Sequence, residues 1–231
     1  MATTLWSRTL DFISPRRCAV CGGRLSLTEH AVCTVCCLRL PRTGFCLTPS
    51  DNPVARLFWG QAAVERAAAL FYYEARSETS RLIYALKYRG RPDIGVALGR
   101  QAAVELAAAG FLAGIDVAVP VPLARRRQRE RGYNQSEAIA RGVSSATGLP
   151  VEARAVVRTL YRGSQTELSR QERLDNVEGA FCLKDSSRLE GRHVLLIDDV
   201  VTTGATAIAC ATAMARVPGI RISFMALGFS K

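Results

Sequence analysis

Two adjacent carboxylates and a loop of small residues stand together in the segment HVLLIDDVVTTGAT, residues 193–206. The loop consists of Thr202, Thr203, Gly204, Ala205 and Thr206. If this loop opens a helix, its backbone N–H groups and the helix dipole form a seat for a phosphate, and the glycine lets the backbone come close. Asp198 and Asp199 can accept hydrogen bonds from vicinal hydroxyls or hold a hard cation such as Mg²⁺. Together these residue types suit a ribose 5-phosphate.

Other interpretations of this segment explain less of it. The segment matches neither the P-loop pattern G-x-x-x-x-G-K-[ST] nor the dinucleotide pattern G-x-G-x-x-G. A helix cap would use Asp198 alone and would leave the second acidic group without a role. A monophosphate site with paired carboxylates is therefore the favoured interpretation.

The cysteines form a second group with recognisable chemistry, because six of the eight lie between Cys18 and Cys46. Four of them make two C-x-x-C pairs, Cys18 with Cys21 and Cys33 with Cys36. Two such knuckles can present four thiolates tetrahedrally, which predicts a closed structural Zn²⁺ site. The alternative, a redox C-x-x-C, needs a βαβ context that residues 18–46 do not show.

The remaining candidates near the cysteine pairs leave the ligand set partly open. Cys37 or Cys46 could replace one of the four cysteines, and His30 lies between the pairs as a weaker alternative. Cys182 and Cys210 stand in apolar runs and are expected to be small core residues.

Charge favours anionic partners. The chain has 31 Lys+Arg and 20 Asp+Glu, a net charge of +11, and a pI near 9.7. Such a field attracts phosphates or nucleic acid. The basic residues are concentrated in RRRQRER, residues 125–131, which we expect to be a loop. A solvated loop that binds nothing is the alternative.

Composition and the N-terminal segment indicate a globular cytoplasmic protein. The 231 residues are 48% apolar and 7% aromatic, enough for one α/β core and an appendage. The most apolar region, 102–124, is interrupted by Glu105 and Asp116, so no membrane span is predicted. Arg8 and Asp11 break the segment where a secretory signal needs an apolar run. In the cytoplasm thiols stay reduced, so a disulfide framework is not expected.

The hydrophobic pattern changes after a turn-rich linker at residues 49–53, which sets a predicted domain boundary near residue 55. Residues 1–55 are expected to hold an N-terminal helix and the four-cysteine module, and residues 56–231 the α/β domain. Strands are predicted at 67–73, 116–122, 154–158, 179–184, 193–197 and 221–229. Helices are predicted at 79–88, 95–109, 134–146 and 204–216, the third with a capping box from Asn134 to Glu137. This alternation predicts a mostly parallel sheet covered by helices.

The segment LLIDDVVTTGAT resembles the phosphoribosyl pyrophosphate (PRPP) binding motif of type I phosphoribosyltransferases. Around it stand ALKYRG (85–90), PVPLARRRQRERGYNQSEAIA (120–140) and RTLYRGSQTELSRQERLDNVEGAF (158–181), in the order typical of the ComF family. The resemblance covers nearly the whole chain. It implies a type I phosphoribosyltransferase-like α/β fold, a parallel sheet flanked by helices, with a small N-terminal zinc-binding module.

The resemblance also implies roles for individual residues. Asp198 and Asp199 would contact the ribose hydroxyls, directly or through Mg²⁺, and the loop 202–206 would hold the 5-phosphate. The pyrophosphate loop would comprise Arg127, Arg131, Gly132, Asn134 and Gln135. A loop that closes over the site would contribute Gln165, Arg170 and Arg173. Lys87 and Gly90 match a family motif to which the sequence assigns no chemistry.

Two functions follow from the resemblance. The first is Mg²⁺-dependent phosphoribosyl transfer with release of pyrophosphate, in a family associated with natural competence and uptake of single-stranded DNA. Residue 2 is alanine, so the N-terminal cysteine nucleophile of glutamine-dependent enzymes is not expected. The alternative is a non-catalytic module that binds PRPP or DNA phosphates and handles single-stranded DNA during transformation. The net charge of +11 favours DNA as a partner, whereas the acceptor and the oligomeric state are not predicted.

Overall fold

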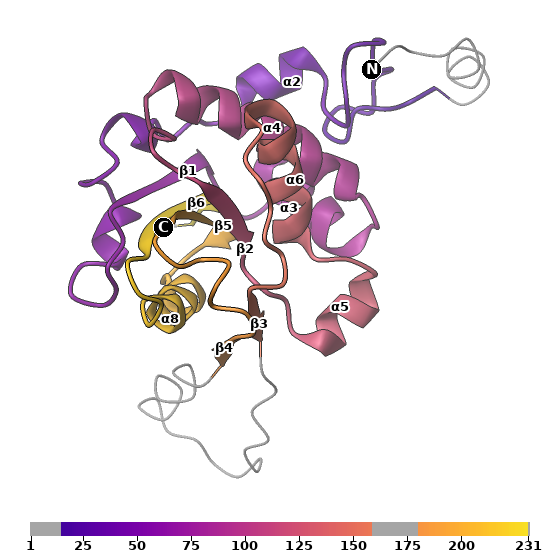
Figure 1. Cartoon of the computed structure of the whole chain (residues 1–231). Helices are drawn as coiled ribbons and strands as arrows, with labels where there is room; N and C mark the ends of the chain where they lie inside the picture. The colour runs from indigo at the N-terminus through magenta and orange to yellow at the C-terminus, as the bar shows by residue number, and fades with distance from the viewer. Residues whose placement is uncertain (1–14, 159–179, 231) are drawn as a thin grey trace, which may run out of the picture.

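Four parallel strands form the central sheet of the computed structural model, which describes residues 15–158 and 180–230 (Figure 1). Their order across the sheet is β1 (Arg66–Tyr72), β6 (Arg221–Phe229), β5 (His193–Val201) and β2 (Val117–Pro120). Nearly every residue of β6 and the first five of β5 are buried. Strands covered on both faces are typical of parallel sheets in α/β proteins.

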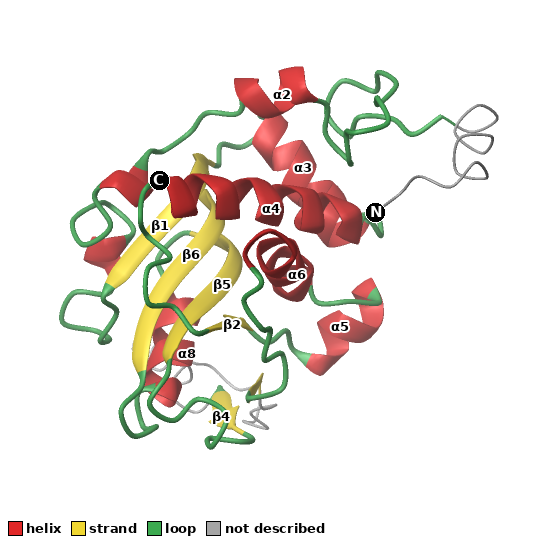
Figure 2. Cartoon of the chain, turned by 45° about the horizontal axis from the view of Figure 1, so that its top comes forward, coloured by secondary structure: helices red, strands yellow, loops and turns green. Residues whose placement is uncertain are grey.

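Helices cover both faces of this sheet (Figure 2). The helices α3 (Glu78–Tyr88), α4 (Pro92–Ala108) and α6 (Gln135–Thr147) lie on one side, and α8 (Ala205–Met214) lies on the other. A second, antiparallel pair of strands, β3 (Val156–Arg158) and β4 (Phe181–Leu183), lies beyond the end of β2. The predicted parallel sheet flanked by helices is confirmed.

Close packing against α4 holds α6 in place. A Cβ atom at Gly99 would lie 2.2 Å from the carbonyl oxygen of Ile139, and one at Gly142 would lie 2.2 Å from that of Val96. Each helix therefore presents a glycine to the backbone of the other. This approach sets how far α6 reaches over the ends of β5 and β2.

The start of α6 has the predicted N-cap residue but not the predicted capping box. Asn134 is its N-cap, and its side-chain oxygen accepts a hydrogen bond of 3.0 Å from the Ser136 N–H. Its Nδ2 atom donates to the carbonyl oxygen of Val121, just beyond β2. Glu137 does not complete a capping box, because its carboxylate pairs with Arg141. The helix start is therefore tied to the end of β2.

The basic run was expected to be a loop, and this expectation is wrong. Residues Arg125–Arg131 form the helix α5, which ends at Gly132 with φ 79°. Arginine, glutamine and glutamate are good helix formers, and glycine is the usual residue at such an end. No residue of α5 is buried, so the sequence has no apolar period to reveal the helix.

The other elements agree with the predicted ones to within a few residues, with one informative difference. The strand predicted at 193–197 extends as β5 to Val201, so both aspartates lie inside the strand. Cys210 is buried as expected, whereas Cys182 is exposed, which corrects its prediction as a core residue. No helix in the described part of the chain is long and apolar enough to cross a bilayer.

The N-terminal segment packs against the edge strand β1. It contains α2 (Thr34–Arg39) and the short 3-10 helices η1 (Phe45–Leu47) and η2 (Ala55–Leu57). Asn52 is buried and donates to the carbonyl oxygens of Thr48 and Ala67, which joins this segment to β1. Residues 1–14 lie outside the described residues, so the predicted N-terminal helix and the boundary near residue 55 stay predictions.

Replacing Gly142 by alanine should destabilise the fold. The added Cβ would collide with the backbone of α4, so we expect Gly142→Ala to lower the free energy of unfolding by about 3 kcal/mol in urea denaturation. Gly148→Ala on the same helix is the control, because its Cβ meets nothing and only its φ of 77° costs about 1 kcal/mol. Equal losses in both variants would contradict the proposed helix contact.

Candidate functional site

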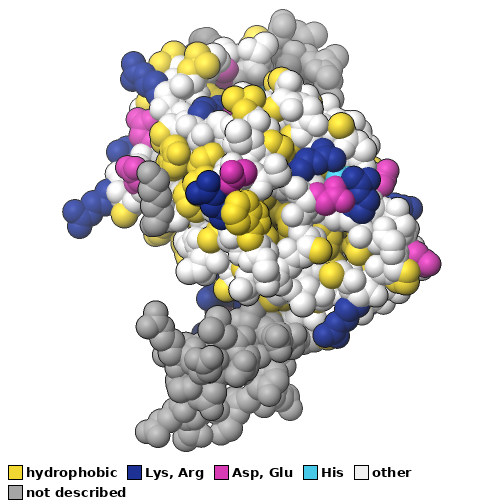
Figure 3. All heavy atoms as spheres, turned by 90° about the vertical axis from the view of Figure 1, so that its left-hand side faces the viewer, with side chains coloured by type: hydrophobic (Ala, Val, Ile, Leu, Met, Phe, Trp, Pro, Cys, Tyr) yellow, Lys and Arg dark blue, Asp and Glu magenta, His cyan; other side chains and the backbone are white. Residues whose placement is uncertain are grey.

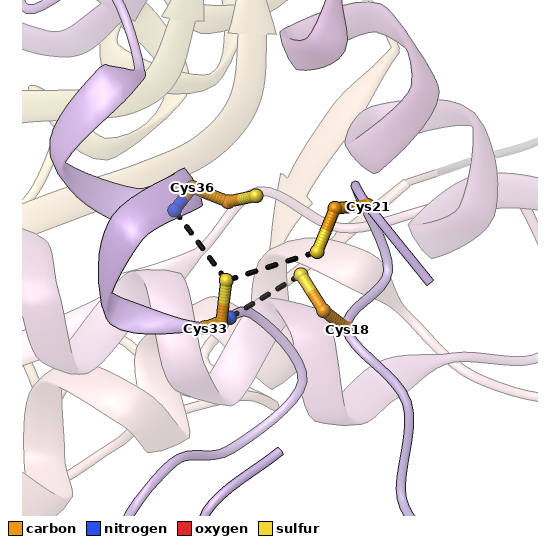
Figure 4. Close-up of side chains that lie close together, drawn as sticks. All are labelled: Cys18, Cys21, Cys33 and Cys36. Atoms are coloured by element: carbon orange, nitrogen blue, oxygen red, sulfur yellow. Dashed lines mark hydrogen bonds between the residues drawn. The ribbon is translucent and has the colours of Figure 1, made fainter. Parts of the chain in front are cut away.

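The four predicted cysteines come together into one cluster (Figure 4). Cys18 and Cys21 lie on one turn, Cys33 caps α2, and Cys36 lies in its first turn. Their sulfur atoms all lie within 4.8 Å of one another, and those of Cys21 and Cys33 are 3.9 Å apart. Among the described residues the cluster contains Cys36 rather than Cys37, Cys46 or His30.

Backbone N–H groups surround these sulfur atoms. The Cys18 sulfur accepts hydrogen bonds from the N–H groups of Val20 and Cys33, and the Cys33 sulfur accepts one from the Cys36 N–H. Burial opposes ionisation of Cys18, but these backbone donors outweigh it and lower the pKa of this thiol to about 7. Burial and the neighbouring thiols raise the pKa of Cys36. Ionisation of all four thiols together would therefore require a cation that balances their charges.

The paired carboxylates form the second candidate site, at the carboxyl end of β5. Asp199 is buried and Asp198 is partly exposed. One oxygen of Asp198 accepts hydrogen bonds from the Ser136 hydroxyl at 3.1 Å and from the Asp199 N–H at 2.8 Å. Because Ser136 lies in the first turn of α6, the positive end of that helix faces the aspartate.

The two negative charges are only partly compensated. Desolvation and the charge of Asp199 raise the pKa of Asp198 to about 7. Asp199 Oδ2 is buried and accepts no well-aligned hydrogen bond from the described residues. The Lys87 ammonium lies 3.1 Å from this oxygen, close enough for an ion pair although the alignment is poor. A ligand hydroxyl or a cation would therefore find an acceptor available here.

A small pocket of about 70 Å³ opens next to Asp198. Its walls include the whole predicted phosphate loop: Thr202, Thr203, Gly204, Ala205 and Thr206. Gly204 caps α8 with φ 77°, a conformation that favours glycine, so the loop turns sharply into the helix. The first backbone N–H groups of α8 thus begin at this pocket, which suits an anion.

A larger pocket of about 540 Å³ lies between the end of α3 and the helix α5. Lys87, Arg127 and Arg131 line it together with Tyr88, Gly90 and Glu130. Lys87 connects this pocket to the aspartates, because the same ammonium pairs with Asp199. Three cations and one carboxylate make the pocket suited to a polyanion.

The other residues predicted for the pyrophosphate loop hold the loop in place. Gly132 ends α5, and the amide of Asn134 is used in capping α6 and in its bond to Val121. Gln135 accepts a hydrogen bond of 2.8 Å from Arg131. The Tyr133 hydroxyl donates to the carbonyl oxygen of Leu86, which fastens this turn to the end of α3.

Three further residues lie near the carboxylates. The sequence alone gives Lys87 no role and does not identify Ser136 and Arg158. Lys87 has its ion pair with Asp199, and Ser136 has its hydrogen bond to Asp198. Arg158, at the end of β3, is the third: burial and the charge of Arg127 lower its pKa, whereas the charge of Asp198 raises it. None of these contacts has a local signal, since each joins distant parts of the chain. The predicted Gln165, Arg170 and Arg173 lie outside the described residues.

Curated relatives share most of the chain. DNA utilization protein YhgH of Escherichia coli K12 is 32% identical over 83% of this chain and 87% of its own length. Competence protein F of Haemophilus influenzae is 27% identical over 82% of this chain and 86% of its own length. Competence protein ComFC of Bacillus subtilis is 38% identical over 39% of this chain and 34% of its own length. No family model matches the chain.

Solved structures show weaker similarity. A glutamine PRPP amidotransferase of B. subtilis is 22% identical with a TM-score of 0.42, over 61% of this chain and 30% of that one. An adenine phosphoribosyltransferase of Leishmania tarentolae is 11% identical with a TM-score of 0.37, over 78% of this chain and 88% of that one. These scores are low, so the description of the fold rests on the chain's own strands and helices.

The fold and the two sites define an α/β protein with a four-cysteine module and an acidic strand end that borders one pocket suited to anions and pairs with Lys87 of a second. Its similarity to YhgH over more than four fifths of both chains places it in a family. The chain belongs to the ComF family, together with DNA utilization protein YhgH and the competence proteins F and ComFC.

A double-mutant cycle should detect the pair between Lys87 and Asp199. Lys87→Met leaves a buried carboxylate without its cation, so we expect it to cost about 2 kcal/mol in wild type and clearly less in an Asp199→Asn background. Urea denaturation measures both costs. Lys184→Met, at an exposed lysine, serves as the control and should change stability little. The same cost of Lys87→Met in both backgrounds would show that the pair contributes nothing.

Proposed function

We propose that the strand-end site binds PRPP with Mg²⁺. One observation carries this proposal: Asp198 lines a small pocket at a helix N-terminus, and Asp199 pairs with Lys87, which lines a larger pocket together with two further cations. PRPP has the matching order of groups, with a 5-phosphate at one end, ribose hydroxyls in the middle and a pyrophosphate at the other end. The resemblance of the LLIDDVVTTGAT segment to the PRPP motif supports the same assignment.

The donor set also fits a divalent cation. Mg²⁺ prefers carboxylate and phosphate oxygens, and Asp199 Oδ2 is a buried oxygen that accepts no well-aligned hydrogen bond from the described residues and has the Lys87 ammonium beside it. Asp198 and Asp199 would hold the cation or the ribose hydroxyls. When bound, Mg²⁺ supplies positive charge against the carboxylates and the leaving pyrophosphate.

We infer further that the site supports phosphoribosyl transfer. In this reaction the bond between ribose C1 and pyrophosphate breaks, and an acceptor nucleophile forms a new bond to C1. Arg127 and Arg131 stabilise the charge that develops on the leaving group, and the phosphate loop fixes the sugar. We place this activity in the cytoplasm, where the thiols of the cysteine module stay reduced.

A second candidate function is binding of single-stranded DNA. The relatives' names refer to DNA utilization and competence, and five of the seven residues of α5 are arginines, none of them buried. An exposed basic helix of this kind attracts a phosphate backbone. This function draws on the same basic surface as the first, because α5 also supplies Arg127 and Arg131 to the larger pocket.

We also propose that the four cysteines bind a structural Zn²⁺. Zinc–sulfur bonds of about 2.3 Å in a tetrahedron place neighbouring sulfur atoms about 3.8 Å apart. The separation of 3.9 Å between the sulfur atoms of Cys21 and Cys33 is close to this value. The cluster also lies on two knuckles, as structural zinc sites commonly do.

Removing one cysteine of the cluster should remove the metal. We expect Cys18→Ser to lose about one equivalent of zinc by elemental analysis and to expose the N-terminal segment to proteolysis, because metal ligation stabilises so small a unit. Cys37→Ser is the matched control, since Cys37 is adjacent to the cluster but not part of it. Full zinc content in the first variant would refute the assignment.

Calorimetric titration tests the PRPP site. Wild-type protein should bind PRPP in the presence of Mg²⁺, and an Asp198→Asn, Asp199→Asn double variant should bind at least tenfold more weakly because it lacks both anionic ligands. Asp51→Asn, at an exposed carboxylate paired with Arg56, should bind as wild type does. Absence of binding to the wild type would overturn the proposal.

A panel of nucleobases and amines then tests catalysis separately. Pyrophosphate release that depends on one acceptor class and is lost in the double variant would support transfer. Intact PRPP binding without release across the whole panel would leave a binding module and contradict the enzymatic part.

A further inference from the structure

An exposed ladder of planar side chains runs along the last turns of α3. Tyr84 and Tyr88 lie one helical turn apart, with ring centroids 5.1 Å apart and planes inclined by 42°. The side chains are 53% and 63% exposed. The Arg89 guanidinium lies 5.6 Å from the ring centre of Tyr84, and that of Arg131 lies 5.0 Å from the ring centre of Tyr88. We name these four residues the α3 ladder.

The α3 ladder continues into the larger basic pocket. Tyr88 and Arg131 line this pocket together with Lys87 and Arg127. The acidic residue in its wall is Glu130, whose carboxylate is already paired with Arg126 at 2.9 Å. Aromatic faces thus share one surface with Arg127 and Arg131, which pair with no carboxylate among the described residues.

Another face of the molecule offers a comparison with the α3 ladder. On the side that lies to the left in Figure 1, basic side chains alternate with acidic ones and with small apolar patches (Figure 3). Trp59 is also exposed, with Arg56 5.8 Å from its ring centre, but that arginine pairs with Asp51. Trp59 is thus a single ring beside an arginine that a carboxylate already neutralises. At the end of α3, by contrast, two rings lie beside several cations and form a platform for stacking.

We propose that the α3 ladder binds single-stranded nucleic acid by stacking unpaired bases on Tyr84 and Tyr88. This inference rests on the second candidate function and assigns its base-contacting surface. Proteins that hold single strands without reading sequence combine aromatic platforms with a basic path for the backbone. Here the rings offer the platform, and Arg127, Arg131 and Lys87 offer the path.

The arginines of the ladder have a part in this binding. In the free protein their guanidinium groups cover one side of the rings, at distances of 5.0 and 5.6 Å from the ring centres. An entering base takes that position on the ring, and the displaced guanidinium turns to a phosphate of the same strand. Arg89 is exposed, so its movement meets little resistance.

A comparison of two oligonucleotides separates stacking from simple charge attraction. The first is a fluorescent oligothymidylate, and the second has the same length but abasic sites in place of its central bases. Wild type should bind the first about 25-fold more tightly than the second, since stacking on each of the two rings is worth about fivefold or more. A Tyr84→Ala, Tyr88→Ala variant should lose this preference and bind both as wild type binds the abasic strand.

Matched variants identify the cause of any loss. Tyr84→Phe, Tyr88→Phe keeps the rings and should bind as wild type does, and Trp59→Ala should have no effect. The slope of affinity against salt should stay unchanged in the double alanine variant and should fall in Arg127→Ala, Arg131→Ala, by about 0.7 for each lost phosphate contact.

The outcomes distinguish this inference from the function on which it rests. Binding of both oligonucleotides with equal affinity, unchanged by removal of the rings, would overturn the stacking proposal and keep DNA binding by charge. No binding of either strand at low salt would overturn both.

Discussion

Asp198 and Asp199 bring two negative charges side by side to the end of a buried strand, where water screens them poorly. The fold compensates them with three separate devices: the Lys87 ammonium, the Ser136 hydroxyl and the positive end of α6. These are incomplete, since one oxygen of Asp199 has no well-aligned donor among the described residues. The rest of the site is the scaffold that keeps this pair together, with one pocket next to Asp198 and another next to Lys87.

The packing of α6 shows how the scaffold does so. Gly99 and Gly142 let α4 and α6 touch backbone to backbone, and Asn134 fastens the start of α6 to the chain after β2. The same turn is held to α3 by the Tyr133 hydroxyl. As a result, Lys87 from α3 and Arg127 and Arg131 from α5 face one pocket, although none of these helices is part of the sheet. A phosphoribosyl ligand and a nucleic acid backbone would both meet these cations, so the two proposed functions share one electrostatic surface.

Sequence patterns predicted most of the framework, and the misses have physical reasons. Apolar runs located the strands, because strands buried on both faces leave continuous hydrophobic segments. They failed at α5, where no side chain is buried and helix propensity alone forms the structure. They also placed Cys182 in the core, since a three-residue edge element with one exposed position looks the same as a buried strand. Asn134, predicted for the pyrophosphate loop, uses its amide for capping and for the bond to Val121, a contact between distant segments that has no local signal.

The sequence by itself determined what depends on short spacing. Two C-x-x-C pairs must place their thiols close together once their knuckles meet, and a strand followed by TTGAT must present a loop at a helix N-terminus. Both signals are local, because a few consecutive dihedral angles set the geometry. Only the tertiary structure decided which cation faces Asp199, which hydroxyl reaches Asp198 and that the α3 ladder borders the basic pocket. These contacts join segments that are distant in the chain, and their distances follow from helix packing over the sheet, which no local pattern encodes.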